Sequence, residues 1–185
     1  MSIERLEITP IWEAGKTWQD WLATNCGAPS RAEMEQIYGD VTLTREQRDG
    51  LQRLAKPVHI LALAEDWCGD VRRNIPVVAR VCAENAAQLR LRLVDKESNE
   101  PLMSRYLTNG AEAIPIVIFL SDHFVETGYW GPRPAECKRI MARGKASGLM
   151  DRARQKITEF YAQDRHVSAV REIIDLIEIA AAREP

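Results

Sequence analysis

The middle of the chain alternates between apolar runs and amphipathic stretches, which predicts strands and helices in turn. The run 58–63 is apolar apart from His59, as expected of a central strand buried on both faces. Residues 89–93 alternate strictly between Leu and Arg, which is typical of a strand with one solvated face. The run 114–120 predicts a second buried strand, and 124–130 a hairpin partner for it.

Helical periodicity fills the intervals between these strands. Apolar residues recur at helical spacing over 69–84, and a second helix is expected within 98–110. A third helix is expected to begin at Pro134, because proline is favourable at the start of a helix. The element order predicted for residues 57–147 is therefore β-α-β-α-β-β-α, an α/β fold.

Both ends of the chain are predicted to be helical. Side chains that cap helix N-termini occur at three places in the first stretch: Thr17, Ser30 with Glu33, and Thr44 with Gln47. Two amphipathic helices follow the α/β stretch. The chain thus divides into an N-terminal helical extension (1–56), an α/β domain (57–147) and a C-terminal helical pair (148–185).

Composition and charge narrow the function classes. The 185 residues carry a net charge of −2, so nothing electrostatic favours nucleic-acid or anionic-membrane binding. Four cysteines are too few for a disulfide scaffold, and neither a signal peptide nor a membrane-length apolar run is apparent. We expect a cytoplasmic protein with reduced thiols. No spacing of His and Cys suggests a metal site and no glycine pattern a phosphate loop, so no metal or cofactor is predicted.

The segment 64–70, AEDWCGD, holds the candidate chemistry. It follows a buried strand and opens a helix, which places Cys68 in the first helical turn. A thiol there faces unpaired backbone N–H groups and the positive end of the helix dipole, and both favour the nucleophilic thiolate. Arg72 and Arg73 add positive charge, whereas the three acidic residues of the segment oppose the thiolate. Cys68 is the candidate nucleophile.

These residues resemble the thioredoxin superfamily. Trp67-Cys68-Gly69 after a hydrophobic strand is similar to its active-site turn, and Ile114-Pro115 before the next buried strand to its cis-proline loop. Four motifs resemble, more closely, a poorly characterised bacterial thioredoxin-like family with a helical N-terminal extension: AEDWCGD (64–70), YLTNG (106–110), IPI (114–116) and YWGPRP (129–134). The resemblance implies a thioredoxin-like core with a mixed four-stranded sheet and helical extensions at both ends.

Two positions depart from the redox pattern of that superfamily. Its second cysteine would fall three residues after Cys68, where this chain has Val71. The buried carboxylate that assists the second cysteine would lie six residues before Cys68, where the chain has Ala62. The chain is therefore not expected to be a thioredoxin-type disulfide reductase.

Another cysteine would have to resolve a mixed disulfide within the chain. Cys82 lies 14 residues along the same helix as Cys68, about 21 Å away, which is too far for a disulfide. Cys137 is expected in the first turn of a helix at the same end of the sheet. It is either a resolving thiol or a packed small residue.

The resemblance also implies a substrate groove around Cys68, formed by Trp67, Gly69, Asp70, Ile114, Pro115, Trp130 and Arg133. A cis Ile114–Pro115 bond exposes the backbone of Ile114, which pairs with an extended peptide in the superfamily. Arg133 is expected to hold a carboxylate of a peptide or a glutathione-like ligand.

Two functions of different classes follow. The first is a monothiol redox protein, in which Cys68 forms mixed disulfides that an external thiol resolves. The second is a non-catalytic thioredoxin-fold module that binds proteins or peptides. An iron–sulfur carrier is disfavoured, because the glutathione-site residues of monothiol glutaredoxins are not apparent. The expected partners are proteins or low-molecular-weight thiols and disulfides, and the sequence leaves the oligomeric state open.

Overall fold

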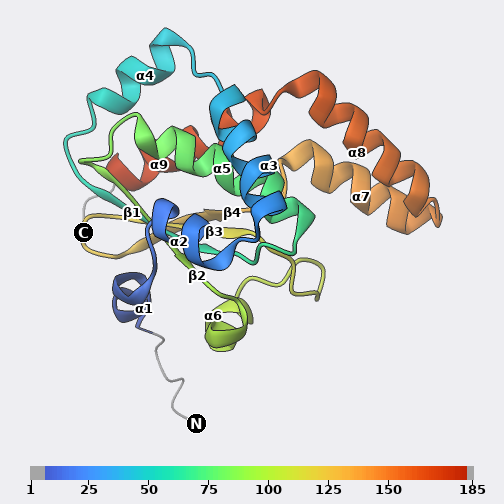
Figure 1. Ribbon diagram of the computed structural model, residues 1–185, viewed down its shortest axis with the longest axis horizontal. Coiled ribbons are helices and arrows are strands. Elements are labelled where there is room, and N and C mark those ends of the chain that lie inside the picture. The colour runs from blue at the N-terminus through green and yellow to red at the C-terminus, as the bar shows by residue number, and fades with distance from the viewer. Residues whose placement is uncertain (1–6, 183–185) are drawn as a thin grey trace.

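A mixed four-stranded sheet lies at the centre of the protein (Figure 1), of which the computed structural model describes residues 7–182. The strands are β1 (Val58–Leu63), β2 (Leu89–Val94), β3 (Ile116–Leu120) and β4 (Glu126–Trp130). They lie in the order β2-β1-β3-β4, with β1 parallel to β2 and β3 antiparallel to both of its neighbours. The predicted α/β fold with a mixed four-stranded sheet is confirmed.

The inner strands β1 and β3 are buried along their whole length. Their apolar runs have no polar alternation because helices and loops cover both faces of the sheet. His59 lies within β1 and is buried, and its Nδ1 donates to the carbonyl oxygen of Ser121 at 3.1 Å. β2 lies at one edge, where Leu93 exchanges two backbone hydrogen bonds with Lys16. The Leu–Arg alternation predicted a strand with one solvated face, and this strand, β2, is an edge strand.

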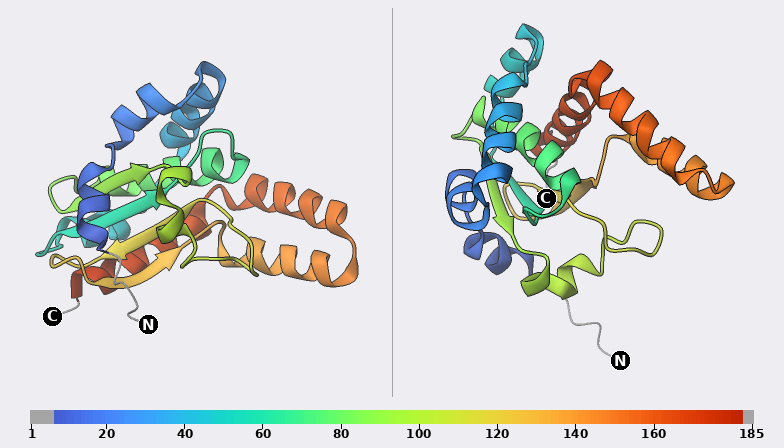
Figure 2. Two further views of the ribbon diagram at one scale, coloured as in Figure 1. Left: turned by 90° about the horizontal axis from the view of Figure 1, so that it is seen from below. Right: turned by 45° about the vertical axis from the view of Figure 1, so that its right-hand side comes forward.

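Helices α5 (Gly69–Ala83) and α9 (Val167–Ala182) pack against each other and against the strands. The helix predicted to begin at Pro134 is present, but it does not supply the helix that packs beside α5 on the sheet. That helix, α7 (Ala135–Ser147), pairs instead with α8 (Met150–Asp164), and the two project away from the sheet (Figures 1 and 2). α9 takes the core position because it buries six apolar side chains, whereas α7 buries only Cys137 and Gly144.

Four short helices precede the sheet: α1 (Ile8–Ala14), α2 (Trp18–Asn25), α3 (Ala28–Asp40) and α4 (Arg45–Gln52). Thr17 caps α2, and Thr44 with Gln47 forms a complete capping box on α4, as predicted. The capping box predicted at Ser30 is wrong, because α3 begins at Ala28, with Gly27 as its N-cap and a proline in its first turn. Proline in the first turn is favourable, so the helix starts before Ser30.

The segment between β2 and β3 contains only a short 3₁₀ turn (Glu97–Asn99) and α6 (Glu100–Met103). Asn109 and Gly110 were expected to end a longer helix. They have positive φ angles and form a separate turn instead. No helix among residues 7–182 is long and apolar enough to cross a membrane.

One hydrophobic core joins all three predicted units. It includes Trp21 of the N-terminal extension, Phe119 of the sheet and Ile177 of α9. The unit boundaries at residues 56 and 147 stay a prediction, but the units pack as parts of a single core.

Candidate functional site

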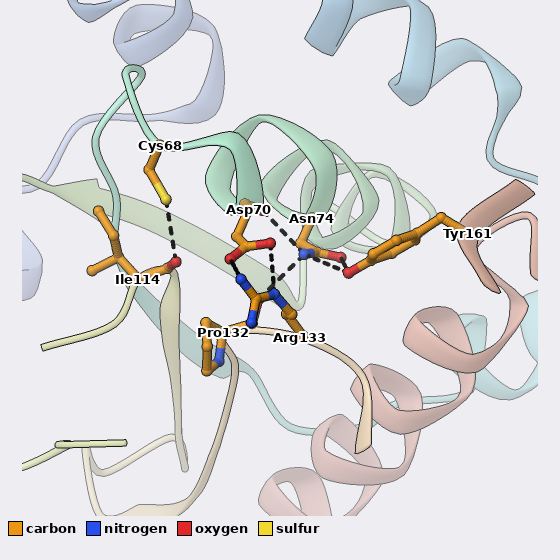
Figure 3. A network of polar contacts seen from close by, with 7 residues as sticks. All are labelled: Cys68, Asp70, Asn74, Ile114, Pro132, Arg133 and Tyr161. Atoms are coloured by element: carbon orange, nitrogen blue, oxygen red, sulfur yellow. Dashed lines mark hydrogen bonds and ion pairs between the residues drawn. The ribbon is translucent and has the colours of Figure 1, made fainter. Parts of the chain in front are cut away.

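Cys68 lies between the end of β1 and the start of α5, where it is the N-cap residue of the helix. Its thiol points toward the carbonyl oxygen of Ile114, with the two atoms 3.5 Å apart (Figure 3). Cys68 is partly exposed, whereas the other three cysteines are buried, and all four are free thiols. The structure therefore brings together one accessible thiol, a helix N-terminus and the backbone of Ile114.

Two loops that contain a proline lie next to each other on the side of the thiol where Ile114 is. The Ile114–Pro115 bond is cis, and so is Gly131–Pro132, which the sequence analysis did not predict. The loops meet at Gly131, where a Cβ atom would lie 2.0 Å from the carbonyl oxygen of Pro115. Gly131 also has a φ of +122°, so both the close approach and the backbone conformation require glycine.

Arg72 fixes the turn that precedes Cys68 by hydrogen bonds to its backbone. The guanidinium donates from Nη1 to the carbonyl oxygens of Asp66 and Trp67, at 2.9 and 3.1 Å, and from Nε to Glu33 of α3 at 2.8 Å. Trp67 itself is 62% exposed, and Gly69 is exposed on the other side of the thiol. Trp67 and Gly69 are thus both accessible on the surface beside Cys68, and their role in a substrate groove stays a prediction.

The three acidic residues around Cys68 all have partners. A carboxylate oxygen of Glu65 accepts from the backbone N–H of Lys96 at 2.8 Å, and Asp66 accepts from that of Gly27 at 3.2 Å. Asp70 forms a two-point ion pair with Arg133, in which Nε donates to Oδ1 at 2.8 Å and Nη2 to Oδ2. Of these three residues, Asp70 is the one that the described part of the chain pairs with a cation.

This pair changes the role expected of Arg133. Burial lowers the pKa of Arg133, but the hydrogen bond and the charge of Asp70 raise it by more, so the guanidinium stays charged. Its fork is occupied by Asp70, and it is not free to receive the carboxylate of a ligand. Arg133 thus binds a carboxylate of the chain itself, two residues after Cys68.

Trp130 does not line an open groove. Its side chain is 3% exposed, and its Nε1 donates to Glu172 of α9 at 2.8 Å. The same carboxylate accepts from the backbone N–H of Ala135 at 3.0 Å, which ties the start of α7 to α9. Trp130 is thus a core residue, because its hydrogen-bonding group is satisfied inside the protein.

Asn74 is a site residue that the sequence analysis missed. Its fully buried amide donates to the carbonyl oxygens of Asp70 and Pro132, at 3.0 and 3.2 Å, and to the hydroxyl of Tyr161 at 3.1 Å (Figure 3). The signal was present in the sequence, since Asn74 is the one polar residue on the buried face of α5. It connects the first turn of α5, the Pro132 loop and α8.

Cys137 is a packed side chain and not a thiol that is accessible for disulfide exchange. It lies in the first turn of α7, as predicted, but it is fully buried in a small cluster with Ile157 and Tyr161. Burial raises the pKa of Cys137 to about 11, and likewise raises the pKa of Cys26 to about 11 and of Cys82 to about 12. These three thiols are therefore mostly protonated at neutral pH and shielded from solvent.

The fold and the position of the thiol at the start of α5 are those of the thioredoxin class, and the comparison with protein families agrees. Residues 15–161 match a family model described as Thioredoxin. The chain therefore belongs to the thioredoxin family. Within residues 7–182, no group of three or more His, Cys, Asp or Glu side chains is arranged to hold a metal ion.

Two solved structures share this architecture. A Pseudomonas aeruginosa protein of unknown function is 18% identical, with a TM-score of 0.73 over 94% of this chain and 98% of the other. An HIV epitope-scaffold protein is 19% identical, with a TM-score of 0.71 over the same shares of the two chains. No curated protein matches the chain. At these identities the likeness defines the fold and does not extend to an activity.

Proposed function

We propose that this protein is a monothiol redox protein that acts through Cys68 and exchanges disulfides with proteins or low-molecular-weight thiols. The observation that carries the proposal is the single partly exposed thiol, at the N-terminus of α5 and 3.5 Å from the Ile114 carbonyl oxygen. A buried structural cysteine would not need this combination of access, helix dipole and adjacent backbone.

Cys68 is the N-cap residue of α5 and therefore lies at the positive end of the helix dipole, although its side chain makes no capping hydrogen bond. Arg133 offsets the charge of Asp70, which is the acidic residue two positions further on. Disulfide exchange needs an accessible sulfur that can attack, so this position supports Cys68 as the proposed nucleophile.

The exchange proceeds in two displacement steps. The Cys68 thiolate attacks one sulfur of a disulfide, which forms a mixed disulfide on Cys68 and releases the other half as a thiolate. An external thiolate then attacks the partner's sulfur in the mixed disulfide, so a new disulfide leaves and the Cys68 thiolate is restored. The external thiol is needed because position 71 is valine and because Cys82 and Cys137 are buried.

The partner is proposed to lie across Trp67 and the backbone of Ile114. Trp67 offers a large exposed apolar surface next to the thiol, and the Ile114 carbonyl oxygen offers a hydrogen-bond acceptor. Arg133 contributes through Asp70 rather than by contact with the partner. A protein segment or a small thiol fits this open surface.

Reaction with oxidised glutathione tests the proposal. The native protein is expected to gain one glutathione by mass, and added dithiothreitol to remove it. Cys68→Ser is expected to gain none, whereas Cys137→Ser behaves like the native protein. A native protein that stays unmodified while folded would contradict the proposal.

The exposure of Trp67 favours a second candidate, a non-catalytic binding module that uses the same surface. The two functions differ in what Cys68 must do. If Trp67→Ala abolishes capture of a peptide ligand while Cys68→Ser leaves it unchanged and Cys68 is inert toward oxidised glutathione, the binding module is the correct account.

A further inference from the structure

A cavity of about 340 Å³ lies far from Cys68, between α2, α3, the end of α5 and strand β2. Leu89 at the start of β2 lines it, and pairs with Val58 at the start of β1, whereas Cys68 follows the end of β1. Cys82 of α5 also lines the cavity, about 21 Å along the helix axis from Cys68. The cavity is therefore separate from the thiol site, and its volume is in the range of pockets that hold small molecules.

Aromatic side chains form much of its wall. Trp12, Trp18 and Tyr38 all border the cavity. The rings of Trp18 and Tyr38 are nearly parallel, at an interplanar angle of 15° and a centroid distance of 6.3 Å. Flat apolar faces of this kind bind flat apolar groups.

The charged groups at the cavity are of one sign. Arg90 and Arg92, on alternate positions of β2, both line it, and no acidic side chain among residues 7–182 does. The guanidinium of Arg92 lies 5.2 Å from the ring centre of Trp12. Its Nε is buried and has no hydrogen-bond partner among residues 7–182. A buried donor without a partner costs free energy, which an acceptor on a ligand would recover.

The backbone of the edge strand β2 offers further hydrogen-bonding groups on its outer side. Leu93 uses its N–H and C=O to pair outward with Lys16, and backbone groups two residues apart in a strand point the same way. Leu91, which lines the cavity, therefore directs its N–H and C=O to the same side of the sheet. The cavity thus combines aromatic walls, two guanidinium groups and a strand edge.

From these observations we propose that the cavity is a binding site for a small organic anion with an aromatic body, such as an aromatic carboxylate or sulfonate. The acidic group pairs with Arg92 and Arg90, since guanidinium binds planar carboxylates in a two-point manner. The ring lies against the wall formed by Trp18 and Tyr38. This site would function independently of exchange at Cys68.

Fluorescence titration with anilinonaphthalene sulfonate tests the proposal, with uncharged phenylnaphthylamine as the matched probe. The native protein is expected to bind the sulfonate saturably and more tightly than the uncharged probe. Arg92→Met keeps the aliphatic stem against Trp12 and is expected to weaken sulfonate binding about tenfold, with little effect on the uncharged probe. Arg143→Met, an exposed position on α7, provides the control for loss of one positive charge.

A second variant fills the cavity without disturbing the core. Ala83 lines the cavity at an exposed position, so Ala83→Phe is expected to fold normally and to abolish binding of both probes. Unchanged sulfonate binding in Ala83→Phe would overturn the proposal. So would equal affinity for the two probes in the native protein, or the absence of saturable binding.

Discussion

Asn74 and Tyr161 are joined by two buried hydrogen bonds: the amide nitrogen of Asn74 donates to the Tyr161 hydroxyl at 3.1 Å, and that hydroxyl donates back to the amide oxygen at 3.2 Å. Asn74 belongs to the helix that begins at Cys68, and Tyr161 to α8 of the projecting pair. The contact therefore anchors the projecting helices to the element that carries the candidate nucleophile.

Removal of either partner should destabilise the protein. Asn74→Ala removes the buried donor that serves both the Pro132 carbonyl and the Tyr161 hydroxyl, and we expect a loss of about 2–3 kcal/mol in the free energy of unfolding. Tyr161→Phe should cost about 1–2 kcal/mol. Urea denaturation measures both, and Tyr129→Phe, at a residue 50% exposed, is the control with an expected effect below about 0.5 kcal/mol. Additive effects in the double variant would show that the two side chains are not coupled.

Gly131 should tolerate no side chain. In Gly131→Ala the new methyl group would meet the Pro115 carbonyl oxygen, at a backbone conformation that L-residues rarely adopt. We expect a loss of about 3 kcal/mol or more, measured as a fall in the urea midpoint. Gly39→Ala in α3, where nothing lies within 4 Å of the added Cβ, should be neutral or stabilising. A native-like midpoint for Gly131→Ala would mean that the two proline loops do not approach each other this closely.

His59 should make stability depend on pH. Burial lowers the pKa of His59 below its ordinary value of 6.5, although the hydrogen bond to Ser121 opposes this effect. The unfolded chain therefore takes up the proton first, and stability is lost as the pH falls from 6.5 through the lowered pKa. The free energy of unfolding, measured by urea at about pH 7.5 and about pH 5.5, should fall less in His59→Gln than in the native protein. The exposed His123→Gln is the control, and an equal fall in all three proteins would contradict the assignment.

The sequence predicts those parts of the fold that depend on residues close together in the chain better than those that depend on distant residues. β1 is found within its predicted limits of 58–63, and the Thr44 capping box is present, because both depend on residues that are close in the sequence. The choice between α7 and α9 as the core helix depends on which amphipathic face the sheet accepts, and periodicity alone does not determine this. At Ser30 the cause was local instead, since Gly27 and a proline in the first turn of α3 provided an earlier start.

In the candidate site too, features that depend on neighbouring residues were predictable, and features that depend on distant residues were not. The position of Cys68 at a helix N-terminus followed from the local pattern of strand, turn and helix. The ion pair of Arg133 with Asp70 joins residues 63 positions apart, so local patterns do not reveal that the arginine is already paired. The burial of Trp130 depended on Glu172 of α9, which is also distant in the sequence.

Val71→Cys should add the missing resolving thiol. Position 71 lies in the first turn of α5, three residues after Cys68, so a thiol there is one helical turn from the nucleophile. Val71 is fully buried, and the smaller cysteine should cost about 1 kcal/mol. The variant should show some dithiothreitol-dependent reduction of insulin, whereas the native protein and the matched Val71→Ala show little. A folded Val71→Cys that forms no disulfide with Cys68 in glutathione buffers would mean that this turn is not built for dithiol exchange.

Site-resolved alkylation tests the central claim most directly, because it compares all four thiols in one folded sample. With limiting iodoacetamide at about pH 8, peptide mass mapping should show Cys68 modified first. Cys26, Cys82 and Cys137 should react much more slowly, because they are buried and their pKa values are raised to about 11, 12 and 11. Modification of Cys26 or Cys137 ahead of an inert Cys68, in protein that remains folded, would contradict the account.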